Sequence, residues 1–528
     1  MTDLDTWAAK LTGTSHVIAS VAGEVRFQGT VTGFRRVFAA ECGSVTVASD
    51  RADALAFLLD APLDERRLAL HLLYPPVLHP LTDLPLWRGV RHVPTDSCLV
   101  LGADRESRQV RWWAPPEPQR PLAEGARALR EALAAAVAAR VKGQELVSSD
   151  LSGLDSTSVC SLAVRSGARV VAYTAASPDP LEDDVFWSHR TAAALPSLEH
   201  HVIPVEELPN VYHGLLDLDE PMDEPCRAAA DHARWLAIAR RAAARGSRLH
   251  LTGFGGDELL TGSPFHLRSL LARRPAFALR QLRGLAAKYR WPPGLMLRQL
   301  WGNRSYSSWL LGVADRLTAP PPTEDTPPLG WGPPPLLPPW VTADAADAVR
   351  ELIRAEAPTA EPLSARREHH GNLLGMLDAT RPLREVDWLA ARAGLRLAAP
   401  YCDDRVLEAA LSVRPEEKYT PWHYKPLLLE AMRGTLPDEI LSRQTKAGGV
   451  NDLDDALREN RADMLRLWEE SQLGGLGLID AGKLRELCRH PLEADPRDLH
   501  GALYQSVACE VWLRTLRGTS IPSTGVRP

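Results

Sequence analysis

The sequence has few cysteines and no long hydrophobic run. Its 528 residues include seven cysteines, which are scattered and show no paired spacing. That pattern argues against a zinc site and fits a reducing compartment, so we expect a cytoplasmic protein. No apolar run reaches the roughly 18 residues that a membrane-spanning helix needs. The acidic first five residues also lack the pattern of a signal peptide.

An excess of positive charge is also missing. The formal net charge is −6, and the isoelectric point is near 6.3. These values predict that the protein as a whole does not bind nucleic acid. Hydrophobic residues make up 45% and charged residues 24% of the chain, which is ordinary for a globular protein. A chain of this length accommodates about two to four domains, each with its own core.

Residues 1–118 predict a first domain that is rich in strands. Short β candidates lie between turns that contain glycine, at residues 15–21, 24–27 and 44–50. A helix is predicted at residues 66–73. Prolines at residues 115–121 form a linker, and an Ala-rich helix is predicted from about residue 123 to residue 141.

The turn at residues 148–157 is the first candidate site, because a buried strand ends before it and an apolar helix follows it. Such a turn leaves the first N–H groups of the helix unpaired at the positive end of the helix dipole, which favours an anion. Gly153 allows close approach of the backbone, and Asp155 supplies a carboxylate suited to Mg²⁺. Hydroxyl donors come from Ser152, Ser156 and Thr157. Taken alone, the same residues also fit an ordinary polar turn.

Strands and helices alternate after this turn. Strands are predicted at residues 168–174, 200–203 and 247–252, with helices at 182–194 and 231–245. This alternation predicts a parallel, doubly wound sheet that binds ligands at the carboxyl ends of its strands.

A second glycine-containing turn, at residues 253–260, follows the third of these strands. Asp155 and Asp257 would then lie at one edge of the sheet, which predicts a Mg²⁺ site beside the phosphate-binding turn. The alternative is that Asp257 only complements the dipole of the helix that it precedes.

Two further regions have unusual composition. Residues 263–304 contain nine lysines and arginines and no aspartate or glutamate. This region predicts a basic surface for a peptide, a partner protein or a lipid face, or else a solvated helical face. Residues 318–341 are rich in proline and predict a loop or linker that is not a packed element. The chain from about residue 342 on is predicted to be helical, with a tail at residues 516–528.

Both glycine-containing turns resemble those of a known superfamily. The segment Ser152-Gly153-Leu154-Asp155-Ser156 resembles the pyrophosphate-binding loop Ser-Gly-Gly-x-Asp-Ser of the ATP-pyrophosphatases, although it has one glycine where that loop has two. The segment 253–260 resembles the Gly-x-Gly-Ala-Asp-Glu-Leu-Phe segment of asparagine synthetases. Residues 219–225 resemble their Asp-Glu-Pro-x-x-Asp-Pro segment. The common nucleotide-hydrolase loop is excluded, because it ends in Gly-Lys-Ser/Thr and there is no lysine here.

The N-terminal region resembles the glutaminase half of class B asparagine synthetases. The matching segments are Ala48-Ser49-Asp50-Arg51, residues 86–94 and residues 111–115. In that family the nucleophile is an N-terminal cysteine, whereas position 2 here is Thr2 and no cysteine precedes Cys42. Thr2 is a residue type that serves as an N-terminal nucleophile in some enzymes. We interpret the domain as a degenerate scaffold.

The last third resembles the same family at three segments. These are residues 385–403, 425–430 and 436–449. The resemblance implies that Lys446 stabilises charge on the phosphates and on the tetrahedral intermediate, and Lys425 begins the second segment. The family glutamate of the "gly-val-glu" segment falls on Arg396. Its acid–base role is therefore vacant or moved to Glu385 or Asp387.

The resemblance implies a fold and a set of site residues. The fold class is α/β: a degenerate Ntn-hydrolase-like α+β sandwich at residues 1–118, then an adenine-nucleotide α-hydrolase-like (HUP) doubly wound sheet with a helical C-terminal part at residues 119–515. The catalytic candidates are Lys446, Lys425, Glu385 and Asp387. The metal candidates for Mg²⁺ are Asp155 and Asp257. The residues assigned to ATP are Leu151, Ser152, Gly153, Leu154, Asp155, Ser156, Thr157, Tyr173, Thr174, Gly253, Gly255 and Gly256.

The implied activity is adenylation of a carboxylate by ATP, with release of pyrophosphate and transfer of the acyl group to an amine. Without the glutaminase nucleophile, the amine is expected to belong to the substrate itself, as in lasso-peptide macrolactam synthetases. A peptide α-amine has a pKa near 7.7–8.0, so a strong general base matters less. The expected partners are a core peptide, a leader-binding protein and a leader peptidase. The alternatives are an asparagine-type or β-lactam synthetase that acts on a small molecule, and a scaffold that no longer binds ATP.

Overall fold

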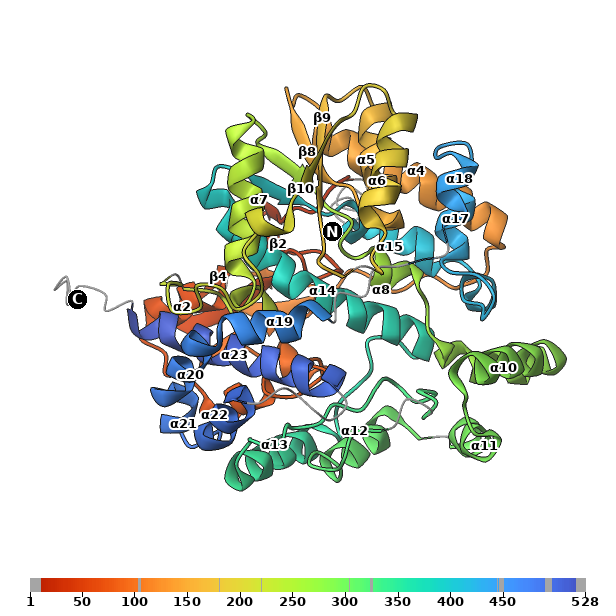
Figure 1. The fold of residues 1–528 in the computed structure, drawn as a ribbon. Coiled ribbons are helices and arrows are strands. Elements are labelled where there is room, and N and C mark those ends of the chain that lie inside the picture. Colours follow the sequence, from red (N-terminus) through yellow and green to blue (C-terminus); the bar gives the residue numbers. More distant parts are fainter. Residues whose placement is uncertain are drawn as a thin grey trace.

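The computed structural model describes residues 11–102, 106–179, 181–219, 221–302, 304–322, 326–443, 445, 451–489 and 496–518. Thr2 and Lys446, two residues singled out from the sequence, lie outside these ranges. Figure 1 shows the chain from its N-terminal strands to its C-terminal helices. No helix in the described ranges is long and apolar enough to cross a membrane.

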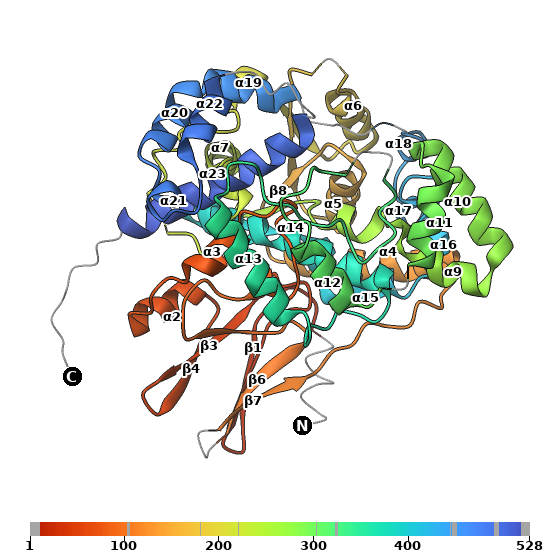
Figure 2. The same ribbon diagram turned by 90° about the horizontal axis from the view of Figure 1, so that it is seen from below.

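Two antiparallel sheets form the N-terminal domain. The four-stranded sheet has the order β1-β2-β6-β7, with β1 (Val17–Val21), β2 (Glu24–Gln28), β6 (Ser97–Leu101) and β7 (Ser107–Arg111). The three-stranded sheet has the order β4-β3-β5, with β3 (Val37–Cys42), β4 (Val45–Ser49) and β5 (Val90–Val93). The first of these sheets projects from the molecule in Figure 2.

Alternation along β3 explains the layers of this domain. Val37 and Ala39 pack into a cluster with Leu99 of the other sheet. Phe38 and Ala40 face the opposite way and pack beneath helix α2 (Ala52–Leu59). Successive side chains of a strand point to opposite faces, so one strand supplies both interfaces. The short helix α3 (Glu65–Leu70) follows α2 in the chain.

A five-stranded parallel sheet forms the second part of the molecule. Its order is β10-β9-β8-β11-β12. The strands are β8 (Val147–Asp150), β9 (Val170–Ala175), β10 (Glu199–Ile203), β11 (Leu249–Leu251) and β12 (Arg396–Ala398). The chain runs outward from β8 to β10 and then returns to place β11 on the other side of β8. The strand order therefore reverses between β8 and β11, where doubly wound folds bind ligands.

Helices cover both faces of this sheet. The helices α5 (Leu154–Arg165) and α6 (Asp184–Ala194) lie on one side, and α7 (His232–Ala244) lies on the other (Figure 1). The helix α4 (Leu122–Val141) packs on α5, and the long α14 (Arg367–Arg392) packs on α7 and β12. The mixed α/β fold expected from the sequence is confirmed, as are the parallel sheet and the N-terminal sheets.

The C-terminal part is helical, as predicted, apart from β12. Its helices are α13 (Ala343–Glu356), α15 (Asp404–Leu411), α16 (Pro415–Lys418), α17 (Pro426–Met432), α18 (Asp438–Leu441), α19 (Asn451–Glu459), α20 (Arg461–Glu469), α21 (Gln472–Gly475), α22 (Ala481–Arg489) and α23 (Pro496–Gly518). Strand β12 is only three residues long, and it forms because it completes the edge of the sheet beside β11. Helix α23 runs past residue 516, where a tail was predicted to begin.

The basic region forms a helical arm, which we define as residues 263–301. It contains a short 3-10 turn (Pro264–His266) and three helices: α9 (Leu267–Arg273), α10 (Pro275–Tyr289) and α11 (Pro293–Trp301). Figure 2 shows the arm as a separate group of helices beside α16. Helix α12 (Tyr306–Ala314) follows it.

The proline-rich segment after α12 has no helix in its described residues, as predicted, yet it packs tightly. Trp331 and Trp340 are buried, and the indole N–H of Trp340 donates to the Ser506 hydroxyl at 2.9 Å.

Candidate active site

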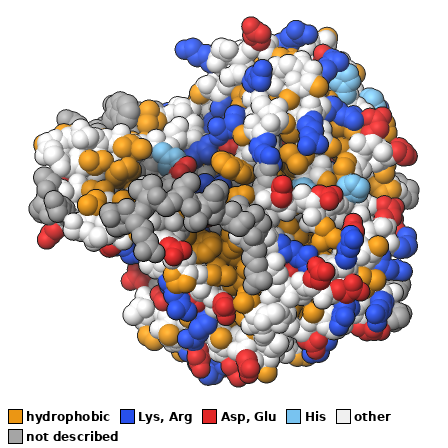
Figure 3. Space-filling view, turned by 90° about the vertical axis from the view of Figure 1, so that its left-hand side faces the viewer, with side chains coloured by type: hydrophobic (Ala, Val, Ile, Leu, Met, Phe, Trp, Pro, Cys, Tyr) orange, Lys and Arg blue, Asp and Glu red, His pale blue; other side chains and the backbone are white. Residues whose placement is uncertain are grey.

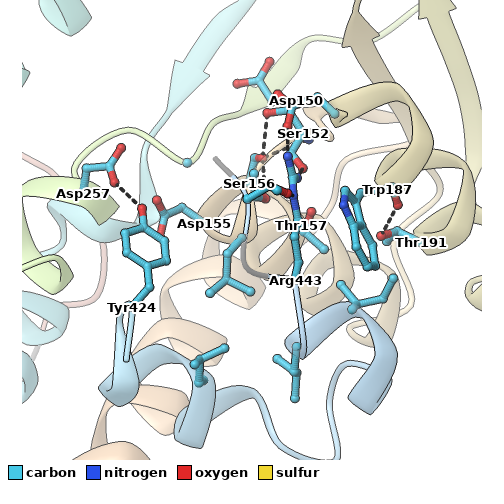
Figure 4. Close-up of a pocket in the computed structure, with 18 of the residues that line it drawn as sticks. Asp150, Ser152, Asp155, Ser156, Thr157, Trp187, Thr191, Asp257, Tyr424 and Arg443 are labelled. Carbon is cyan, nitrogen blue, oxygen red and sulfur yellow. Dashed lines mark hydrogen bonds and ion pairs between the residues drawn. The ribbon is translucent and has the colours of Figure 1, made fainter. Parts of the chain in front are cut away.

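Two loops at the reversal of strand order form a pocket of about 310 Å³. One loop joins β8 to α5, and the other joins β11 to the short helix α8 (Gly256–Leu260). Because β8 and β11 are parallel neighbours, both loops emerge at the same carboxyl edge of the sheet. Residues 423–445 close the opposite side. Figure 4 shows labelled side chains from these three segments, together with Trp187 and Thr191 of a further helix, around the pocket.

The N-terminus of α5 faces the pocket without a side-chain cap. Its N-cap is Gly153, and no side chain accepts from the first-turn N–H groups. The Ser156 hydroxyl accepts instead from the backbone N–H of Ser152 at 3.1 Å and donates to the Gly153 carbonyl. A Cβ at Gly153 would meet no protein atom within 4 Å, so the space in front of the loop is open. This arrangement suits a phosphate group.

Two glycines of the second loop allow the loops to touch. A Cβ on Gly253 would lie 2.6 Å from the backbone nitrogen of Ser156, and one on Gly256 would lie 2.5 Å from Cγ of Asp155. Gly255 has φ of +89°, a conformation that favours glycine. The close contact holds Asp155 and the start of α8 together at the edge of the sheet.

Lys425 joins the two predicted metal-binding carboxylates. Its ammonium group binds Asp257 Oδ1 at 2.8 Å and forms a short contact with Asp155 Oδ2, and its side chain is only 1% exposed. Burial lowers the pKa of Lys425, but the carboxylates of Asp155 and Asp257 outweigh burial and raise it above the usual value. The Tyr424 hydroxyl donates to Asp257 at 3.0 Å (Figure 4). Lys425 itself has φ of +43°, which is uncommon for a residue with a side chain.

Arg443 crosses the pocket from the opposite side. It donates to the carbonyl of Ser152 at 3.0 Å and binds the carboxylates of Asp183 and Asp184 at 2.6 and 2.5 Å. The Thr445 hydroxyl also donates to Asp183. Desolvation raises the pKa of Asp183, and the hydrogen bonds from Thr445, Trp187 and Arg443 reverse the shift and lower it. The guanidinium therefore fastens the segment after α18 to the phosphate-binding loop.

Aromatic side chains and one imidazole complete the pocket. Trp187 and Phe254 line it together with Leu429 and Ile440. Phe254 packs against Trp235, with ring centroids 5.7 Å apart. His423 is the one imidazole that lines this pocket among the described residues. The pocket thus combines an apolar surface for a flat ring with polar groups at one end.

The structure brings most of the predicted nucleotide-binding residues to this pocket. Ser152, Gly153, Leu154, Asp155, Ser156, Thr157, Gly253 and Asp257 line it. Gly255 and Gly256 are not part of the lining, but Gly256 packs directly against Asp155, which is. Leu151 is fully buried, and its carbonyl accepts from the Thr174 hydroxyl. Tyr173 and Thr174 are not part of the pocket lining, and the ring of Tyr173 stacks on His201.

The predicted metal site has no three-carboxylate cluster. Among the described residues, no group of three or more metal-binding side chains is present. Asp155 and Asp257 nevertheless fit Mg²⁺ in its usual setting, where one or two carboxylates hold the ion and substrate phosphates supply the other ligands. Both carboxylates already bind one cation, the ammonium of Lys425, which shows that this position attracts positive charge. Lys446 lies outside the described residues, although the preceding Thr445 lines the pocket.

Glu385 and Asp387 lie in a different cavity, of about 270 Å³, between the N-terminal domain and α14. Glu385 is 2% exposed and accepts from the backbone N–H of Asp223 at 3.2 Å. Burial, followed by the charge of Asp223, raises the pKa of Glu385 to about 8. The structure therefore does not bring this predicted catalytic pair to the pocket that Asp155 lines.

Arg396 also lies away from the pocket. It is the first residue of β12 and pairs with Leu249, so it lies at the amino edge of the sheet, opposite the two loops. Its guanidinium binds both oxygens of Asp387, at 2.8 and 2.9 Å. The Arg396 substitution therefore does not change the charge of the pocket lining.

Several pocket residues were not predicted from the sequence. These are Asp150, Asp184, Trp187, Phe254, His423, Tyr424 and Arg443. Phe254 lies between Gly253 and Gly255 in a turn that was predicted to bind the nucleotide, so its position in the chain could have identified it as a pocket residue. Tyr424 precedes Lys425, and Arg443 lies three residues before Lys446. No local pattern shows that the side chains of Tyr424 and Arg443 point toward the pocket.

Comparison with known protein families matches residues 128–514 to asparagine synthase. The matched range covers the parallel sheet, both loops of the pocket and the helices that follow. No curated protein matches the chain.

Proposed function

The chain belongs to the asparagine synthase family of ATP-dependent amide-forming ligases, and from this premise we propose that it is a peptide macrolactam synthetase of the lasso-cyclase type. It would activate an Asp or Glu side chain of a core peptide by adenylation with ATP. The N-terminal amine of the same peptide would then displace AMP and form an isopeptide bond. Pyrophosphate and AMP are the other products.

The observation that carries the nucleotide part of this proposal is the pocket at the reversal of strand order. It presents the uncapped N-terminus of α5 beside two carboxylates and an apolar surface. The helix N-terminus suits the phosphates, the two carboxylates suit Mg²⁺, and the apolar surface suits an adenine ring. A polar turn without a ligand would not require Gly253 and Gly256 to press the two loops together.

Support for an amine that belongs to the substrate comes from the N-terminal domain. Its two described cysteines, Cys42 and Cys98, lie within strands β3 and β6. Cys98 is fully buried. Neither cysteine resembles the terminal nucleophile with which a glutaminase releases ammonia. An amine carried by the substrate removes the need for that reaction.

The chain's own residues would act as follows. The first-turn N–H groups of α5 would hold phosphate oxygens, and Asp155 and Asp257 would hold Mg²⁺, an ion that would supply charge neutralisation for the leaving pyrophosphate. Lys425, charged and buried, fixes the spacing of these carboxylates. Arg443 keeps the segment that leads to Lys446 against the loop of residues 150–153. Lys446 would neutralise charge on the phosphates and on the tetrahedral intermediate.

His423 would accept the proton that the amine loses when it attacks. It lines the pocket next to Tyr424, whereas Glu385 and Asp387 do not. Because part of a peptide α-amine is already neutral near pH 8, this proton transfer needs only a weak base.

The test is pyrophosphate release from Mg²⁺·ATP by the purified protein, with Asp155→Ala as the inactive control. One reaction contains a core peptide encoded beside the gene, and another contains aspartate and ammonia. Release with the peptide alone, with a product lighter by one water, supports the proposal. Release with aspartate and ammonia would identify an asparagine-type synthetase. Absence of both release and ATP binding would identify a scaffold.

A further inference from the structure

The helical arm carries positive charge that its own fold does not neutralise. Its side chains at Arg274, Arg280, Arg283, Lys288, Arg290 and Arg298 are all exposed. Among the described residues, the arm's single ion pair within 4.0 Å joins Arg273 to Glu416, at 3.9 Å. Exposed cations without acidic neighbours repel one another, which costs stability unless an anionic partner uses them.

Most apolar residues of the arm pack inside it, although Leu279, Tyr289 and Leu297 are exposed. Leu270, Leu282, Leu285, Trp291 and Met296 are buried together in a small core of their own. The surface of the arm therefore carries the six exposed cations named above and only these three large exposed apolar side chains among the described residues. On the opposite side of the molecule, acidic and basic side chains are interspersed (Figure 3). An unbalanced positive surface thus distinguishes the arm from that face.

The base of the arm contacts the loop that closes the pocket. A Cβ on Gly284 would lie 2.6 Å from Cγ of Pro421, so α10 and this loop are in direct contact. The amide of Gln281 donates to the carbonyl of Glu416 at 2.8 Å. Arg280 lies over the ring of Trp422, 5.1 Å from its centroid. Two residues further on, Tyr424 lines the pocket and binds Asp257.

We infer that the arm is the docking surface for an acidic segment of the peptide substrate. This inference rests on the proposed function and adds to it the class of sequence that the enzyme recognises outside the reacting residues. A chain docked on the exposed cations of the arm would continue past Arg280 and Trp422 toward Tyr424, which lines the pocket. The positive charge of the arm favours acidic residues in the partner. Because the arm also contacts the loop that leads to the pocket, the partner is expected to be one that reaches the pocket. A separate acidic protein or a membrane would have no need of that second contact.

The test measures binding to the full-length protein without ATP. The probe is a fluorescein-labelled oligo-glutamate peptide of about ten residues, and the readout is fluorescence anisotropy at low salt and at about 0.15 M salt. The variant is Arg283→Glu with Lys288→Glu and Arg298→Glu. A second variant replaces the same residues with glutamine and avoids any effect of like-charge pairs on folding. The matched control reverses three exposed cations elsewhere: Lys142, Arg169 and Arg240.

We expect the arm reversal to weaken binding by about tenfold, the glutamine variant to weaken it less, and the control to change it by less than about twofold. Salt is expected to weaken binding to the wild type more than binding to the arm variant. Equal loss in arm variant and control would overturn the inference. So would binding of the wild type to phosphatidylserine vesicles without binding to the peptide.

Pyrophosphate release with a core peptide that carries an acidic extension separates this inference from the proposed function. The arm variant is expected to raise KM for that peptide about tenfold and to leave kcat unchanged. An unchanged KM, with peptide-dependent release intact, would overturn the docking assignment alone. Release that requires aspartate and ammonia would overturn the proposed function, while the anisotropy result would still report on the arm.

Discussion

Two clusters of carboxylates in this protein have opposite uses. At the carboxyl edge of the sheet, Asp155 and Asp257 share one ammonium group, and Asp257 is 42% exposed toward a pocket. Between the domains, Glu224 is surrounded by Arg36, Arg381 and Arg384. The first cluster opens to solvent at a pocket, beside the N-terminus of α5. The second is closed and also contains Asp83, which binds Arg381 at 3.3 Å, so its charges join the two domains.

The comparison shows that burial of charge does not by itself mark an active site. Perturbed pKa values are found in both clusters. They point to a functional site only where a pocket and a ligand-binding backbone lie beside them. The helix N-terminus of α5 supplies that backbone at the first cluster. The predictions below alter one cluster at a time.

Asp155→Ala is expected to have the largest effect on activity. It removes one Mg²⁺ ligand and leaves Lys425 with a single carboxylate, so pyrophosphate release should fall on the order of 10³-fold. A pyrophosphate assay with saturating ATP checks it. The exposed Asp344→Ala is the control and should leave the rate unchanged. A rate within tenfold of the wild type for Asp155→Ala would show that the carboxylates play no part in catalysis.

Glu224→Gln is expected to have the largest effect on stability. It removes the carboxylate that three arginines share, although Arg381 keeps its contact with Asp83 at 3.3 Å. Loss of one partner from a buried ion cluster costs about 3–5 kcal/mol. Arg36, Arg381 and Arg384 hold the pKa of Glu224 well below its usual range against the effect of burial. Denaturant unfolding measures the loss. The activity per folded molecule should stay close to that of the wild type, which separates this cluster from the pocket.

Glu385→Gln tests whether this residue is structural or catalytic. The folded carboxyl keeps its proton up to a pKa of about 8, while the unfolded one loses it near 4.5. The stability of the wild type therefore falls as the pH rises between these values, because the unfolded state releases its proton first. The glutamine variant lacks this loss and keeps the bond to Asp223. It should match the wild type at pH 5 and be more stable by about 1–3 kcal/mol at pH 8. A large loss of kcat would instead restore a catalytic role for Glu385.

Arg443→Ala is expected to have an intermediate effect on nucleotide binding. It releases the segment after α18 from the carbonyl of Ser152 and from Asp183 and Asp184. We expect KM for ATP to rise about tenfold, since the loss of charge-assisted hydrogen bonds weakens the closed pocket by about 1.5–3 kcal/mol. Arg443→Lys keeps the charge but not the forked geometry, so it should recover only part of the affinity.

His423→Ala is expected to have the smallest effect. A peptide amine is partly neutral near pH 8, so loss of a weak base should lower kcat by less than about tenfold at that pH and by more at pH 6.5. The pH profile of kcat checks this. An identical profile for variant and wild type would exclude His423 as the base.

The elements of the sheet and the two loops could be predicted because their signals are local. A buried strand, a small-residue turn and an apolar helix are contiguous in the chain, and glycine marks the turn in each case. The same reasoning missed β12, because a strand of three residues at the edge of a sheet has no periodicity of its own. The proline-rich segment was correctly predicted to lack helices, but its burial depends on contacts with α23 that no local pattern contains.

The family, the strand–loop–helix units and the pair of aspartates at the ends of two strands can be recognised from local sequence. These follow from residue types at short spacing, which set backbone conformation and hydrogen bonding directly. The tertiary structure sets which titratable groups share a pocket. It joined Lys425 to Asp155 and Asp257 across 270 and 168 positions of the chain. It places Glu385, Asp387 and Arg396 together in a second cavity. That cavity lies away from the active-site pocket, because Arg396 begins strand β12 and so lies at the amino edge of the sheet.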